Sequence, residues 1–162
     1  MIKIRRIVIE NPPGEDAQQV HNGLRDGMKS AVRLWQRDIA GRHFRDGASE
    51  KYGYQPRGRK YLNRKKRVWG HRRPLVYSGL TEKWVRYRVA TPKVRKIGEG
   101  GLSARLPVKV PKYFFQYRGS GPNKFDELVR TLPEEYDAMF ELIDTAIDRR
   151  LARARRRKVV TP

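Results

Sequence analysis

Two short segments hold a large share of this chain's positive charge, and they limit how much of it can pack into one core. Residues 57–73 contain nine Lys and Arg and residues 149–158 contain seven, with no acid in either segment. The remaining sequence has 22 bases against 17 acids, which is an ordinary balance. Because like charges repel, we expect both segments to stay extended until an anionic partner neutralises them.

The length of 162 residues predicts a single domain over residues 1–162, since domains cluster near roughly 100–150 residues. Residues 47–73 are expected to form an extended basic-aromatic arm, and residues 149–162 a basic C-terminal tail. Cysteine is absent, which excludes disulfides and thiolate metal sites. Neither a signal-peptide pattern nor an apolar run of about 18 residues is present, so we expect a soluble protein made in the cytoplasm, with no membrane partner.

Two helices are predicted from apolar stripes. The first follows Val20, Leu24, Met28, Ala31, Trp35 and Ile39, at spacings of three and four. Gly23 and Gly27 lie within it and either admit a close neighbouring backbone or weaken its middle. The second stripe follows Tyr136, Met139, Phe140, Ile143, Ile147, Leu151 and Ala154. Thr131 and Glu134 match a capping box at its start, and acids at the start with arginines at the end suit the helix dipole.

Strands are predicted from runs of β-branched and alternating residues. Residues 2–9 are rich in isoleucine, and residues 84–90 alternate Val and Tyr with Arg. Residues 102–110 are expected to return after the turn at 98–101, completing a β-hairpin. The predicted class is α+β: a small antiparallel sheet with a β-hairpin, a long N-terminal helix, a C-terminal amphipathic helix and a long basic loop.

The basic segments are the candidate contact surface. In the arm, bases alternate with Tyr and Trp, a combination that both neutralises phosphates and offers rings for stacking. The partner could be DNA, RNA or an acidic protein surface, and in the alternative both segments are merely solvated. The candidate interface or polyanion-contact residues are Arg57, Arg59, Lys60, Tyr61, Arg64, Lys65, Lys66, Arg67, Trp69, Arg72, Arg73, Tyr77, Arg155, Arg156 and Arg157.

No catalytic or metal site is predicted. His21, His43 and His71 lack a second ligand at helical spacing, and His43 is expected to close a helix end. The acids between Asp126 and Asp148 are expected to spread along the solvent face of the last helix rather than to cluster around Mg²⁺. The sequence therefore predicts a non-enzymatic protein without cofactor, metal or small-molecule substrate.

The segment Arg73-Pro-Leu-Val-Tyr-Ser-Gly-Leu80 resembles a Pro-Leu-x-x-(Thr/Ser)-Gly signature of tailed-bacteriophage neck proteins, the head–tail joining or tail-completion family. The order of helix, aromatic-basic loop, signature, hairpin and C-terminal helix is similar over roughly residues 16–155. Two features depart from the family pattern: Gly79 is followed by Leu80 rather than by Arg, and the stretch after the hairpin lacks the family's acid.

The resemblance implies a structural virion protein that assembles as a homo-oligomeric ring at the head–tail junction, around the DNA channel. Its arm (47–73) and hairpin (83–110) would contact neighbouring subunits and other neck or tail proteins, with DNA as a further contact. The alternative is a non-enzymatic basic RNA- or DNA-binding module of ribosomal or chromosomal type.

Overall fold

The computed structural model describes residues 2–6, 15–76, 79–87, 91–97, 101–106, 108, 110, 114 and 123–160. Its internal contacts divide the chain into two compact units, where the sequence predicted a single domain. The paired-helix unit comprises Met1–Trp35, Thr91–Pro107 and Pro133–Pro162, and the basic unit comprises Gln36–Ala90 and Val108–Leu132.

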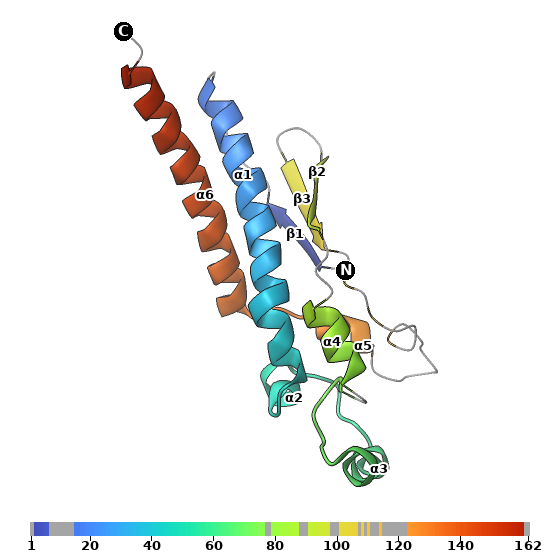
Figure 1. The fold of residues 1–162 in the computed structure, drawn as a ribbon. Coiled ribbons are helices and arrows are strands. Elements are labelled where there is room, and N and C mark those ends of the chain that lie inside the picture. Colours follow the sequence, from blue (N-terminus) through green and yellow to red (C-terminus); the bar gives the residue numbers. More distant parts are fainter. Residues whose placement is uncertain are drawn as a thin grey trace. The chain divides into compact units, whose positions relative to one another are not determined.

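Two long helices, α1 (Glu15–Leu34) and α6 (Pro133–Val160), run side by side in the paired-helix unit (Figure 1). The predicted apolar stripes lie between them, since Leu24 and Met28 on α1 and Met139 and Ile143 on α6 are buried. Both predicted helices are therefore confirmed. Helix α6 begins at Pro133, where a missing N–H costs nothing.

The two glycines of α1 mark where the helix backbones approach each other most closely. A Cβ added at Gly23 would lie 2.6 Å from Ile147 Cα, and one at Gly27 would lie 2.5 Å from Ile143 Cα. Real Cβ atoms essentially never come so near, and the contacts are with backbone atoms that cannot rotate away. Of the two readings left open by the sequence, close approach is the correct one.

A three-stranded antiparallel sheet packs against α1 in the order β1 (Ile2–Arg6), β3 (Gly101–Leu106), β2 (Lys93–Ile97). Ile2 pairs with Leu106, and Lys93 pairs with Arg105. On the central strand β3, Leu102 and Ala104 are buried. The α+β class and the small antiparallel sheet with its hairpin are thus confirmed.

The predicted strand over residues 84–90 is wrong over residues 84–87, where the chain forms helix α4 (Leu80–Tyr87), and residues 88–90 lie outside the described residues. Strands β2 and β3 make the hairpin instead. Thr81 and Val85 are four residues apart and both buried, so the packing of one helical face overrides the alternating pattern. The predicted turn at 98–101 and the residues of the first strand beyond Arg6 lie largely outside the described residues.

The basic unit is built from short helices. The chain passes through a π-helix (Trp35–Ile39) and a 3₁₀-helix (Ala40–Phe44) into α2 (Ala48–Lys51), α3 (Arg59–Trp69) and α4, and later into α5 (Lys124–Leu128). The predicted extended arm at 47–73 is therefore wrong for its larger part, because α3 is helical and ends at Gly70 with φ of 73°. No helix in the described part of the chain is long and apolar enough to cross a membrane.

Candidate binding site on the basic unit

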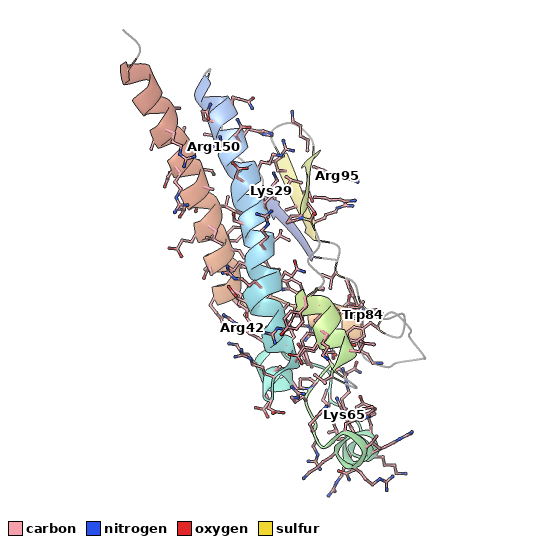
Figure 2. All side chains as sticks on the ribbon, in the orientation of Figure 1. Lys29, Arg42, Lys65, Trp84, Arg95 and Arg150 are labelled. Carbon is pink, nitrogen blue, oxygen red and sulfur yellow. The ribbon has the colours of Figure 1, made fainter. Side chains whose placement is uncertain are left out.

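Helix α3 carries six bases and no acid within its eleven residues. Figure 2 shows its side chains spreading around the ribbon, with nitrogen-tipped cations extending outward around the labelled Lys65. Five of its bases are exposed: Arg59, Lys60, Arg64, Lys66 and Arg67. Helix formation replaces the expected extended charge run with a compact cationic surface, which places the charges at fixed helical spacing.

Large apolar side chains lie among these charges. Tyr61, Val68 and Trp69 on α3 are 42%, 55% and 41% exposed. Trp, Tyr and Arg are the residues that dominate macromolecular interfaces, where their rings and planar cations exclude water. The surface of α3 therefore has the composition of a docking face rather than of an ordinary solvated helix.

Lys65 differs from its neighbours on α3 because it is buried, with 3% exposure. Its ammonium group donates to the Arg73 carbonyl oxygen at 2.5 Å and lies 5.7 Å from the Tyr61 ring centroid. Burial, and then the positive charges of Arg57, Arg73 and Lys124, lower its pKa to about 8. A buried cation beside like charges is a candidate functional site.

A cavity of about 420 Å³ opens beside Lys65, within the basic unit. Its described lining consists of Ser49, Arg57, Tyr61, Leu62, Lys65, Arg72, Pro74, Leu75, Val76, Phe114 and Lys124. Four of these residues are cations and none is an acid, while the floor is apolar. The volume falls within the range of roughly 300–1,000 Å³ that is typical of ligand pockets.

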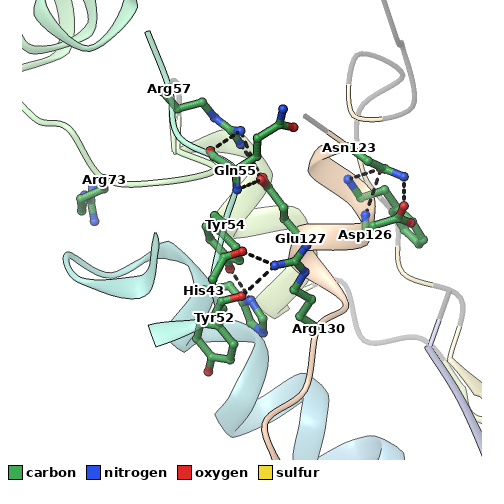
Figure 3. A network of polar contacts seen from close by, with 12 residues as sticks. His43, Tyr52, Tyr54, Gln55, Arg57, Arg73, Asn123, Asp126, Glu127 and Arg130 are labelled. Atoms are coloured by element: carbon green, nitrogen blue, oxygen red, sulfur yellow. Dashed lines mark hydrogen bonds and ion pairs between the residues drawn. The ribbon is translucent and has the colours of Figure 1, made fainter. Parts of the chain in front are cut away.

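A buried carboxylate holds one wall of the cavity in place (Figure 3). Glu127 of α5 is 2% exposed and accepts from the Gln55 backbone N–H at 3.0 Å and from Arg57 Nη1 at 3.2 Å. Arg57 Nη2 pairs with the second carboxylate oxygen. Arg130, two residues after the end of α5, donates to the Tyr52 carbonyl oxygen at 3.0 Å. These contacts tie the segment before α3 to α5.

The stacked rings of His43, Tyr52 and Tyr54 connect the segment before α3 to the 3₁₀-helix. The His43 ring stacks on Tyr52 at 4.0 Å between centroids, and His43 Nδ1 shares a hydrogen bond of 2.5 Å with the Tyr54 hydroxyl. All three residues are buried, and burial lowers the pKa of His43 to about 4, so the ring is neutral at physiological pH. His43 lies in the last turn of the 3₁₀-helix (Ala40–Phe44), at the helix end that the sequence indicated.

The chain leaves α3 through an unusual turn. The Val76 N–H donates to the Pro74 carbonyl oxygen at 2.6 Å across Leu75, whose φ of 54° is left-handed. Gly79, just before α4, has φ of 76°. A leucine in that region costs of order 1–3 kcal/mol and persists only where its surroundings hold it, which is common at functional sites. Leu75 is buried and lines the cavity.

The structure brings most of the predicted contact residues together. In the basic unit, on α3 or in the segments that flank it, lie Arg57, Arg59, Lys60, Tyr61, Arg64, Lys65, Lys66, Arg67, Trp69, Arg72 and Arg73. Tyr77 lies outside the described residues. Arg155, Arg156 and Arg157 belong to α6 in the paired-helix unit. The C-terminal run to Val160 is helical, so the tail continues α6.

Several site residues escaped the sequence analysis. Glu127 precedes the predicted last helix and was given no role of its own, but it lies buried in the separate helix α5. The signal was present in Asn123, whose side chain caps α5 by accepting from the N–H groups of Phe125 and Asp126. Leu75 and Phe114 also line the cavity, and their separation in sequence gave no sign of it.

Within the described residues there is no group of three or more His, Asp or Glu that could hold a metal ion. Comparisons of the chain with protein-family models, with curated proteins and with solved structures give no match.

Proposed function

We propose that this chain is a non-enzymatic structural protein of the tailed-phage neck, of the head–tail joining or tail-completion kind. It assembles as a ring around the DNA channel at the head–tail junction of the virion, against neighbouring neck or tail proteins. The observation that carries this proposal is the exposed face of α3, which combines Tyr61, Val68 and Trp69 with five bases.

Exposed apolar groups are concentrated in the basic unit. Among the described residues, the large exposed hydrophobic side chains are Tyr61, Val68, Trp69, Leu80, Tyr87 and Tyr136, and all but the last belong to that unit. Monomeric proteins seldom leave such groups clustered unless a partner covers them. This concentration supports a protein that works through contacts with other macromolecules.

The signature segment provides a second line of support. The left-handed backbone of Leu75 and Gly79 brackets the residues on which the resemblance rests. A turn of this kind imposes its residue types, since glycine adopts φ of 76° without the penalty that other residues incur. The glycine of the signature therefore has a structural reason to occur at position 79, whereas Leu75 adopts its left-handed backbone at a cost.

One edge of the sheet is formed by a strand with exposed bases. Strand β2 is at one edge and exposes Lys93, Arg95 and Lys96. Charged residues on an edge strand discourage indiscriminate strand pairing, so a partner at this edge would need opposite charge. The hairpin of β2 and β3 thus remains part of the proposed inter-subunit contact surface.

Removing the aromatic side chains of α3 tests the proposal. We expect the double variant Tyr61→Ser, Trp69→Ser to fold and to give separate heads and tails in electron micrographs of phage lysates. Tyr87→Ser on α4 is the control, because it removes a ring outside α3 that is even more exposed, at 69%. Joined particles at wild-type yield in the double variant would contradict the proposal. Deleting residues 50–73 is unsuitable, since Tyr52 and Tyr54 are buried.

A nucleic-acid-binding module is the second candidate, favoured by the same observation that Tyr61 and Trp69 lie exposed among bases. Aromatic faces and cations together bind single strands. A dedicated binder that neutralises roughly 6–10 phosphates loses about 10³–10⁵ in affinity between roughly 50 and 200 mM salt. Weak binding without a defined site size supports the neck protein instead.

A further inference from the structure

Helix α3 presents its exposed bases on one side. Each residue of an α-helix is turned by about 100° from the one before, so the five exposed bases fall within about 160° of the circumference. These residues, called the basic face, are Arg59, Lys60, Arg64, Lys66 and Arg67. The buried Lys65 lies opposite the middle of the basic face, so α3 packs through its Lys65 side and directs the bases to solvent. Figure 2 shows nitrogen-tipped side chains extending outward from this helix.

The basic face has no ion-pair partner in the described part of the chain. Helix α3 contains no acid, and none of the five bases makes a described hydrogen bond or ion pair. Arg72 adds a further cation beside them, because its Nη2 donates to Asn63 Oδ1 at 2.9 Å. Asn63 lies about one turn from Arg59 and about one turn from Arg67, within the basic face. A polyanion can therefore bind the five bases without first breaking an internal ion pair.

The basic face carries no ring on which a nucleobase could stack. Tyr61 and Trp69 each lie about 140° around the helix from its middle, on the side that flanks Lys65. Proteins that bind single strands stack successive bases on aromatic side chains, whereas cations alone contact the phosphates and read no sequence. Asn63 is the uncharged polar side chain on this face, and its Oδ1 already accepts from Arg72. The basic face therefore favours a duplex, bound without regard to sequence.

The length of the basic face suits the major groove of DNA. Arg67 follows Arg59 by eight residues, which places the two about 12 Å apart along the helix axis at about 1.5 Å per residue. The major groove of B-DNA is about 12 Å wide and admits an α-helix, whereas the major groove of duplex RNA is deep and narrow. Bases at the two ends of α3 can therefore reach phosphates on both walls of the groove.

We propose that the basic face of α3 binds duplex DNA at the major groove, through the phosphates and without reading sequence. This inference rests on the proposed function, in which the ring surrounds the DNA channel, and it names the surface that contacts the DNA. Because Tyr61 and Trp69 lie on the other side of the helix, a contact with DNA does not cover them. One helix can then contact DNA and a neighbouring protein at the same time.

The salt dependence of binding to a short labelled DNA duplex tests the basic face. Fluorescence anisotropy gives the affinity of the full chain between roughly 50 and 200 mM salt, and each phosphate contact contributes about 0.9 to the slope of log affinity against log salt. The double variant Arg59→Gln, Arg67→Gln should therefore make the slope shallower by about 1.8. Arg45→Gln, Arg95→Gln is the matched control, because it removes the same charge from two exposed arginines outside α3 and should leave the slope unchanged. Equal urea midpoints show that both variants are folded.

The form of the nucleic acid and the groove are tested with the wild type. Duplexes of different sequence should bind equally, and a single strand or an RNA duplex should bind more weakly. Methyl green, which occupies the major groove, should displace the chain, whereas netropsin, which occupies the minor groove, should not.

Four results would overturn the proposal. The first is an equal change of slope in the two double variants, which would indicate unspecific attraction to a chain of net charge +21. The second is displacement by netropsin, and the third is a wild type that does not bind the duplex at about 50 mM salt. The fourth is a single strand or an RNA duplex that binds as tightly as the DNA duplex. If Tyr61→Ser, Trp69→Ser weakened that binding, α3 would be assigned to single-stranded nucleic acid instead.

The two proposals fail separately, because copy number in purified particles is measured without reference to α3. Particles that contain the chain in fixed amount, together with a slope that Arg59→Gln, Arg67→Gln leaves unchanged, would keep the neck assignment and refute the DNA-binding face. The expected change of slope in a chain that is absent from particles would keep the DNA-binding face and refute the neck assignment.

Discussion

Replacing Gly23 or Gly27 with alanine puts a methyl group where α6 already lies. At Gly27 the new Cβ would be 2.5 Å from Ile143 Cα, whereas ordinary van der Waals contact begins at 3.4 Å. The helices therefore have to separate by nearly an ångström. Overpacking against backbone costs up to about 3 kcal/mol, and alanine returns about 1 kcal/mol of helix propensity. We expect each variant to lose about 2 kcal/mol of unfolding free energy.

Urea unfolding followed by circular dichroism measures this loss, and hydrogen exchange of α1 and α6 amides locates it in the paired-helix unit. Gly58→Ala is the matched control. A Cβ at Gly58 meets nothing within 4 Å, and its φ of −57° is ordinary, so stability should not fall. If Gly23→Ala and Gly27→Ala were as stable as the wild type, the close approach of the two helices would be refuted.

Three further predictions concern the basic unit. Glu127→Gln should cost about 3 kcal/mol, because it leaves the cation of Arg57 without its buried partner. Asp126→Asn, on the same short helix but exposed, should change the urea midpoint little. The pKa of His43 is about 4 in the folded chain against 6.5 ordinarily, so the unfolded chain binds the proton first. Stability should therefore be complete above pH 6.5 and fall as pH drops towards 4, a loss that His43→Gln removes. Gly79→Ala should destabilise by about 1 kcal/mol in thermal unfolding, since its φ of 76° is left-handed.

The two long helices could be predicted from the sequence because their stripes are regular and long. Leu24 and Met28 lie four residues apart in the stripe of α1, and Ile143 belongs to the stripe of α6. The structure buries all three. Periodicity over many turns is a signal that tertiary context seldom overrides. From the sequence, Gly23 and Gly27 could either admit a close neighbouring backbone or weaken the helix. Only the position of α6 shows that they admit a close backbone.

Helix α3 could not be found by the same route. Its inward side holds the half-buried Leu62 and the buried Lys65, so a lysine occupies the position where an apolar residue would be expected. That lysine is buried by residues distant in sequence, Phe114 and Lys124 among those around the cavity. Gly70, which ends the helix in a left-handed conformation, was the local signal available.

The misplaced strand has a related cause. Val85 and Tyr87 alternate with arginines in a pattern typical of a strand, yet Thr81 and Val85 pack on one face of α4. Strand β2 was not predicted because three of its five residues are bases. What makes it a strand is its pairing with β3, which its own residues do not indicate.

Quantitative mass spectrometry of purified phage particles tests the proposal that this chain is part of the phage neck. Particles are prepared from cells that carry the phage genome encoding this chain, and the copy number of the chain is measured relative to a capsid protein. A fixed small number per particle, with labelled antibody bound at the head–tail junction, is the predicted result. Absence from particles, with the chain recovered on RNA or DNA instead, would contradict the account and favour the nucleic-acid-binding module.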